Sequence, residues 1–162
     1  MNKAEIYQFL TEQGISYEAT EHKAVFNMED LGSVELPYPE WDAKNLFVRD
    51  DKKRNYYLIT VRGNKRVDLK AFRRQHNLRA LSFASAEELL SIMALTPGSV
   101  TPLGILNDAE HRVQVYLDAE FAGNMIGVHP NDNTASVWMQ ADDLMGLLHR
   151  HGNAAEYTQI DS

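Results

Sequence analysis

The first residues of the chain have the spacing of an amphipathic helix. Ile6, Phe9 and Leu10 recur at helical intervals behind Asn2, a residue that can cap a helix, and Gly14 can end it. We therefore expect a helix here that buries one apolar face.

A second helix start is marked by Ser85 and Glu88, which have the spacing of a capping box and predict a helix over residues 86–95. Asp68 can cap a basic helix in a similar way. The other expected helices cover residues 27–34, 69–76 and 142–151.

Extended segments alternate irregularly with these helices. Residues 45–48 and 56–61 are apolar runs on either side of a polar turn, and they predict a β-hairpin. Further strands are expected at residues 15–20, 78–83, 105–106, 113–117, 125–128 and 135–139. Because no regular βαβ repetition is present, the pattern indicates an α+β fold with a curved, barrel-like mixed sheet flanked by helices. We expect residues 1–162 to form a single domain.

Positive charge is concentrated in one part of the chain. Twelve of the sixteen Lys and Arg residues lie between Lys44 and Arg79 with only three acidic residues, which gives this window a net charge of +9. The other four basic and twenty acidic residues carry −16, within an overall charge of −7. This segregation favours binding of a polyanion at one place over diffuse adsorption. The alternative is a solvated face with local ion pairs.

Composition and motifs exclude several classes of chemistry. The chain contains no cysteine, so disulfides, zinc–thiolate sites and a cysteine nucleophile are ruled out. It lacks a signal-peptide pattern and any apolar run near the ~20 residues of a membrane helix, so we expect a soluble cytoplasmic protein. No HExxH, P-loop or GxGxxG motif is present, and no cofactor is expected. An enzyme of this sequence would act through positioning and backbone electrostatics.

Three local features remain as candidates for function. Lys44 and Asn45 open an apolar strand, where the lysine could hold a phosphate as a flexible charge or could be an ordinary edge lysine. The loop Gly98, Ser99, Val100, Thr101 and Pro102 could aim backbone groups at a reacting centre, or could simply connect a helix to a strand.

The third feature is a turn formed by His129, Pro130 and Asn131, with Thr134 nearby. Pro130 restricts the backbone of His129 towards extended angles, which could hold the imidazole at the edge of a cleft. The alternative is a purely structural turn.

In this order, these pieces resemble the YbaK/prolyl-tRNA-synthetase-associated domain family of trans-editing aminoacyl-tRNA deacylases. The similarity extends over nearly the whole chain, and the ordered set of motifs is specific although each motif alone is weak. The branch that it resembles most is the ProX or PrdX type, a group of alanyl-tRNA(Pro) deacylases. The matching segments are residues 21–26, 44–57, 63–70, 98–104 and 127–131 with Thr134. Leu103 and Asp132 differ slightly from the residues that are commonest at these positions in that branch.

The resemblance implies hydrolysis of the ester between a wrong amino acid and the 3′-terminal adenosine of tRNA, without a metal or organic cofactor. It implies that Lys44 anchors the terminal phosphate, that Asn45 orients the adenosine or the aminoacyl group, and that the loop from Gly98 to Pro102 positions the carbonyl and the attacking water. His129 would line the aminoacyl pocket. The other substrate-binding candidates are His22, Ser99, Val100, Thr101, Pro130, Asn131 and Thr134.

With this resemblance, the basic window is interpreted as a surface for the acceptor stem of tRNA(Pro). Its candidate contacts are Arg62, Lys65, Arg66, Lys70, Arg73 and Arg74. Prolyl-tRNA synthetase is a possible second partner. The apolar walls of the pocket are expected among Val25, Phe26, Leu31, Leu46, Ile105 and Val128, all of which could equally be core residues.

Two other interpretations stay open at this point. One is the same reaction on cysteinyl-tRNA(Pro), which the His129–Pro130–Asn131 wording disfavours. The other is a tRNA- or synthetase-binding module without catalysis, which the intact Lys44 and Gly98 loop disfavour. A solute-binding domain is a distant third and leaves the basic window unexplained.

Overall fold

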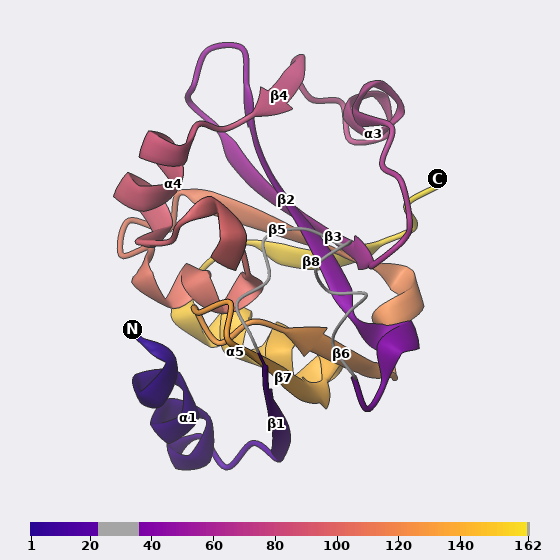
Figure 1. The fold of residues 1–162 in the computed structure, drawn as a ribbon. Helices are drawn as coiled ribbons and strands as arrows, with labels where there is room; N and C mark the ends of the chain where they lie inside the picture. The colour runs from indigo at the N-terminus through magenta and orange to yellow at the C-terminus, as the bar shows by residue number, and fades with distance from the viewer. Residues whose placement is uncertain (23–35, 162) are drawn as a thin grey trace.

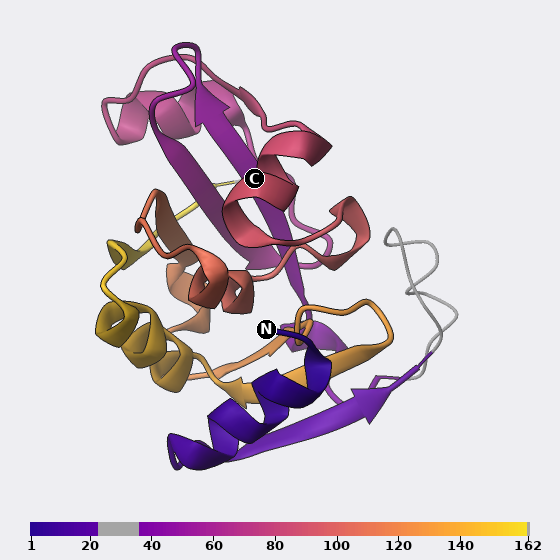
Figure 2. The same ribbon diagram turned by 90° about the vertical axis from the view of Figure 1, so that its left-hand side faces the viewer.

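The computed structural model describes residues 1–22 and 36–161, which form two β-sheets with helices packed against them (Figure 1). The end of the molecule that carries α1 and β1 lies opposite the end that carries α3 and β4, as two perpendicular views agree (Figure 2). Within the described residues, no helix is long and apolar enough to cross a bilayer.

The smaller sheet joins the first strand of the chain to two late ones. Its order is β1 (Tyr17–Glu21), β7 (Ala135–Gln140) and β6 (Met125–Val128), and both pairs are antiparallel. Tyr17 lies opposite Met139 in this ladder. The sheet therefore ties the N-terminal region to the segment that contains His129.

The larger sheet is mixed. Its order is β4 (Leu81–Phe83), β2 (Ala43–Asp50), β3 (Tyr56–Arg62), β5 (Val113–Asp118) and β8 (Ala155–Thr158). The pairs on the β4 side of β3 are antiparallel, and those on the β8 side are parallel. The β2–β3 hairpin expected from the apolar runs is present.

The structure describes four α-helices, and three of them begin at the residues that the capping signals predict. The four are α1 (Lys3–Glu12), α3 (Leu69–Gln75), α4 (Ala86–Met93) and α5 (Ala141–His151). Asn2 and Ser85 each form a complete capping box, and the Asp68 carboxylate accepts hydrogen bonds from two backbone N–H groups of α3. Short 3₁₀ helices cover Pro39–Trp41, Pro97–Ser99, Pro102–Asn107 and Ala119–Phe121.

Both faces of the larger sheet are covered, so β3 is buried along nearly its whole length. On one face, Phe47 and Leu58 belong to the main core together with residues of α1, α4 and α5. On the other face, Val48 and Ile59 pack against Phe72 of α3. This alternation along β2 and β3 decides which side chains can reach the candidate site.

The expected α+β class is confirmed, but the described strands form two sheets and do not close into a barrel. The prediction of a strand at residues 105–106 is wrong, because these residues belong to a 3₁₀ helix that starts at Pro102. The strand β8 was not anticipated. The helix expected at residues 27–34 lies outside the described residues.

Candidate active site

Asn45 connects the start of β2 to the loop after α4. Its side-chain oxygen accepts a hydrogen bond from the Thr60 hydroxyl of β3 at 2.6 Å, and its side-chain nitrogen donates to the backbone carbonyl of Val100 at 3.3 Å. Since Thr60 is directly opposite Asn45 in the β2–β3 ladder, the strand pair fixes the amide in one orientation.

The loop itself is fixed to the turn that contains His129. The buried Thr101 hydroxyl donates to the His129 carbonyl at 2.6 Å and accepts from the Leu103 N–H at 3.3 Å. Ser99 is also buried, and its N–H donates to the Thr96 carbonyl at 2.9 Å. The loop is therefore rigidly held, as a loop that positions reacting groups must be.

The imidazole of His129 is oriented by one backbone contact. Its Nδ1 lies 2.9 Å from the Ala135 carbonyl oxygen, which can only accept, so Nδ1 carries the proton and Nε2 is the acceptor. Burial lowers the pKa of His129, with a smaller contribution from His22, so the ring is held in its neutral form. The two imidazole rings lie edge to face with centroids 6.3 Å apart, and His22 Nε2 is 3.1 Å from the Ser136 hydroxyl.

The turn after His129 is stabilised by contacts with the N-terminal residues. Pro130 is buried, and Asn131 has a left-handed φ of 61° while its side-chain nitrogen donates to the Met1 carbonyl at 2.9 Å. The Thr134 hydroxyl lies 3.0 Å from the Lys3 ammonium. Within the described part of the chain, the buried Asn131 Oδ1 has no hydrogen-bond donor. The contributions of Met1 and Lys3 to this turn were not predicted, because no local pattern marks contacts between residues so far apart in the chain.

Lys44 does not point into the cluster that Asn45 joins. It lies opposite Val61 in the hairpin and so shares the face of β2 that packs towards α3, whereas Asn45 shares the opposite face. Burial lowers the pKa of Lys44, and the nearby positive charge of Arg66 lowers it further. Among the residues that the structure describes, no carboxylate pairs with the Lys44 ammonium.

Some Lys and Arg side chains of the basic window form ion pairs or hydrogen bonds within the fold, and others form no ion pair with a described residue. The Lys65 ammonium lies 2.6 Å from the buried Asp118 carboxylate and 3.3 Å from Glu120. Arg62 donates to the Glu40 carbonyl at 2.8 Å and stacks over Trp41. These two cations therefore already have partners within the fold, with which a phosphate would have to compete.

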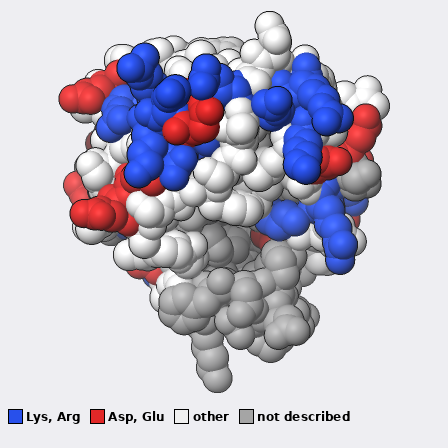
Figure 3. All heavy atoms as spheres, turned by 90° about the horizontal axis from the view of Figure 1, so that it is seen from above, with Lys and Arg blue, Asp and Glu red and all other residues white. Residues whose placement is uncertain are grey.

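The cations that form no ion pair with a described residue are a different subset of the expected tRNA contacts. They are Arg66, Lys70, Arg73 and Arg74, three of them in α3. Figure 3 shows Lys and Arg side chains gathered on the face of the molecule that carries α3 and the β2–β3 turn, with few acidic side chains among them. The charge segregation in the sequence thus becomes a basic face in the structure.

The expected apolar walls have different locations. Ile105 and Val128 are buried in the main core. Leu46 is half-buried at the edge of β2 and lines a hollow there. Val25, Phe26 and Leu31 lie outside the described residues.

The chain matches the family model of the aminoacyl-tRNA editing domain over residues 22–147. It belongs to this family. The segment matched runs from His22, past Asn45 and the Gly98 loop, to beyond His129, and so contains the site described above.

Two curated relatives cover almost the full length of this editing-domain chain. It is 35% identical over 152 residues to the prolyl-tRNA editing protein ProX of Acetoanaerobium sticklandii, with 93% of each chain covered. It is 29% identical to the prolyl-tRNA synthetase associated domain-containing protein 1 of Mus musculus, covering 93% of this chain and 92% of the relative.

Solved structures share the fold. A crystal structure described as a candidate trans-editing enzyme for prolyl tRNA synthetase superposes with a TM-score of 0.70 at 20% identity, covering 100% of this chain and 98% of the other. Family and fold together confirm the expected class of enzyme, a deacylase that hydrolyses aminoacyl-tRNA. Among the described residues, no group of three His, Asp or Glu side chains is arranged to hold a metal ion.

Proposed function

We propose that this editing domain hydrolyses the ester that joins alanine to the 3′-terminal adenosine of tRNA(Pro). One observation supports this proposal above all. Hydrogen bonds join Asn45, the Gly98 loop and His129 into one rigid cluster, although these residues are far apart in the sequence. The name of the ProX relative and the resemblance to the alanine-specific branch support prolyl-tRNA as the substrate class.

The loop is suited to stabilise the negative charge that develops during hydrolysis. Attack of water on the ester carbonyl gives a tetrahedral oxyanion, whose collapse breaks the bond to the ribose oxygen and releases alanine and tRNA after that oxygen takes a proton. The backbone N–H groups of Val100 and Thr101, just after the 3₁₀ helix Pro97–Ser99, are the candidates to donate to the oxyanion. In this role, rigidity of the loop matters more than any side chain.

His129 is assigned to the amino group of the substrate. Because its Nδ1 proton is used by the Ala135 carbonyl, the neutral ring presents Nε2 as an acceptor for the α-ammonium group of alanine. A synthetase pocket for proline excludes alanine poorly, since each missing methylene costs only ~1–3 kcal/mol of discrimination. A smaller second pocket admits alanine and rejects proline by size.

Lys44 and the unengaged cations are assigned to the tRNA backbone. Lys44, beside Arg66 on the α3 face of β2, would hold the phosphate of the terminal nucleotide. Lys70, Arg73 and Arg74 would contact phosphates of the acceptor stem without reading sequence. Prolyl-tRNA synthetase is the protein partner that the names of the relatives suggest.

The test is release of labelled alanine from Ala-tRNA(Pro) by the purified protein, with Pro-tRNA(Pro) and Cys-tRNA(Pro) alongside. We expect rapid loss of alanine while proline is retained. Preferential release of cysteine would mean that the substrate is Cys-tRNA(Pro) and not Ala-tRNA(Pro). Binding of all three without hydrolysis would leave a tRNA-binding module in place of an enzyme.

A further inference from the structure

A small hollow lies at the edge of β2, next to the candidate active site. It has a volume of about 220 Å³, and its lining includes Asn45, Leu46 and Phe47 of β2 together with Phe83, Leu89 and Val100. Ligand pockets usually measure about 300–1,000 Å³, so this hollow suits one flat ring system better than a whole nucleotide.

The hollow exists because the edge of β2 is only partly covered. The short strand β4 pairs with β2 from Val48 to Asp50, and a last hydrogen bond joins the Ala84 N–H to the Phe47 carbonyl at 3.0 Å. Backbone groups of alternate residues point to the same side of a strand, so the N–H and C=O of Asn45 also face this edge. A nucleobase offers both donors and acceptors that could pair with them.

Phe83 forms the exposed rim of the hollow. Its side chain is 61% exposed, more than any other large apolar residue of the described chain; Leu90 follows at 59%. An exposed phenyl ring beside a ring-sized hollow is the arrangement with which proteins stack unpaired bases. Leu90 is similarly exposed but does not line the hollow.

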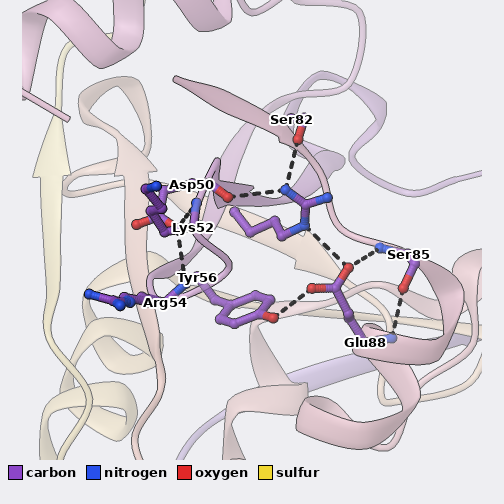
Figure 4. A network of polar contacts seen from close by, with 8 residues as sticks. Asp50, Lys52, Arg54, Tyr56, Ser82, Ser85 and Glu88 are labelled. Atoms are coloured by element: carbon purple, nitrogen blue, oxygen red, sulfur yellow. Dashed lines mark hydrogen bonds and ion pairs between the residues drawn. The ribbon is translucent and has the colours of Figure 1, made fainter. Parts of the chain in front are cut away.

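The wall that carries Phe83 is fixed by a polar network at the start of α4 (Figure 4). The Glu88 carboxylate accepts hydrogen bonds from the Tyr56 hydroxyl at 2.5 Å, the Ser85 N–H at 2.9 Å and Arg49 Nε at 3.3 Å. Arg49 also donates to the Ser82 hydroxyl at 3.2 Å, directly before Phe83. The exposed ring is therefore presented by a rigid segment, which reduces the entropy lost on binding.

The hollow and the two sites beside it are arranged like the base, the ribose and the phosphate of a single nucleotide. Asn45 and Val100 line it and also belong to the cluster assigned to the ester, while Lys44 lies on the other face of the same strand and is close enough to feel the charge of Arg66. A terminal nucleotide that crosses the edge of β2 would place its phosphate, its base and its esterified ribose at three adjoining sites. This placement argues for a nucleobase over a peptide as the occupant.

We propose that Phe83 and this hollow bind the base of the 3′-terminal nucleotide of tRNA by stacking. The inference rests on the proposed function, because it takes the aminoacyl end of tRNA as the ligand. It adds a binding residue, Phe83, and a reason why an unpaired 3′ end is required.

The test compares two tRNA(Pro) ligands, one intact and one lacking the terminal nucleotide, against Phe83→Ala and the matched surface variant Leu90→Ala. Phe83→Ala is expected to weaken binding of intact tRNA about tenfold, the loss typical of one stacked aromatic, and to leave binding of the shortened tRNA unchanged. Phe83→Trp is expected to retain affinity, and Leu90→Ala to behave as the unmodified protein with both ligands. Unchanged thermal unfolding of the variants shows that the fold is retained.

Equal affinities of Phe83→Ala and the unmodified protein for intact tRNA would overturn the proposal, and so would an equal loss with both ligands. Loss of binding to prolyl-tRNA synthetase with tRNA binding intact would also overturn it and make Phe83 a protein contact. These binding measurements need no turnover, so they are separable from failure of the proposed hydrolysis.

Discussion

The Thr101 hydroxyl donates a hydrogen bond of 2.6 Å to the backbone carbonyl of His129. This bond joins the loop that follows α4 to the turn that follows β6, two segments that share no strand pairing. Through this contact the loop and the His129 turn keep a fixed separation.

Replacement of Thr101 by valine tests this coupling, because valine keeps the shape and removes the hydroxyl. The His129 carbonyl loses its donor in a buried place, so we expect a loss of about 1–3 kcal/mol in the free energy of unfolding, measured by urea denaturation. We also expect kcat to fall more than KM rises, since substrate contacts remain. Thr101→Ser should restore both, and a pure KM effect in the valine variant would contradict the positioning role.

Lys44→Ala is expected to lower kcat/KM for Ala-tRNA(Pro) at least tenfold while the fold is retained, because a charge–phosphate contact is lost. Lys44→Arg should keep part of the activity, since it preserves the charge but not the compact ammonium. Deacylation kinetics and circular dichroism measure the two effects. Normal activity of the alanine variant would remove Lys44 from the site.

Charge reversal on α3 separates tRNA contacts from structural cations. Lys70→Glu with Arg74→Glu is expected to weaken tRNA binding and to make the dependence of affinity on salt less steep, because fewer counterions are released. Arg66→Glu with Lys70→Glu should act in the same direction. Lys65→Ala should chiefly lower stability, since it leaves the buried Asp118 carboxylate unpaired. Filter binding at several salt concentrations distinguishes them, and unchanged affinity of the charge-reversed proteins would place the tRNA elsewhere.

Asp42 gives stability a pH dependence. Burial raises the pKa of its carboxyl from 3.8 to about 7. A raised pKa means that the folded state binds the proton more tightly, so this stabilisation is present below pH 4 and is lost as the pH rises towards 7. Asp42→Asn removes the group, and its Tm relative to the unmodified protein should therefore be higher at pH 8 than at pH 5. If the difference in Tm between the two proteins does not change with pH, the Asp42 carboxyl has an ordinary pKa.

Gly127 lies against the ring of Trp138, where a Cβ atom would come within 2.2 Å of a ring carbon. Gly127→Ala is therefore expected to destabilise the fold by about 1–3 kcal/mol, the usual cost of overpacking. Combining it with Trp138→Leu should cost less than the sum of the two single changes. Additive losses in urea denaturation would mean that the ring moves aside freely.

Local signals predicted most of the elements, and pairing over long distances was less visible. The capping residues Asn2 and Ser85 marked the helix starts because capping acts within one turn. The pairing of β1 with β7 joins residues more than one hundred positions apart, and it divides the strands into two sheets where one curved sheet was expected. The strand β8 escaped notice because Ala155–Thr158 is short and only half-buried.

The sequence predicted which residues belong to the candidate site better than it predicted how they are arranged. The motifs identified Asn45, Thr101 and His129, but no sequence spacing shows that hydrogen bonds join them. Sequence could not show that Lys65 is engaged by Asp118, because that partner lies fifty-three positions away. Phe83 was seen only as the end of a strand, since exposure of an aromatic residue depends on how far its neighbour β2 is covered.

The pairing of β1 with β7 also sets when the enzyme can act. The carbonyl of Ala135, the first residue of β7, orients His129, and the rest of β7 completes the sheet on which that turn rests. During synthesis, residues are added one at a time from the N-terminus, so β1 waits for its partner until most of the chain has been made. A growing chain on the ribosome therefore lacks a formed editing site until β7 has been made.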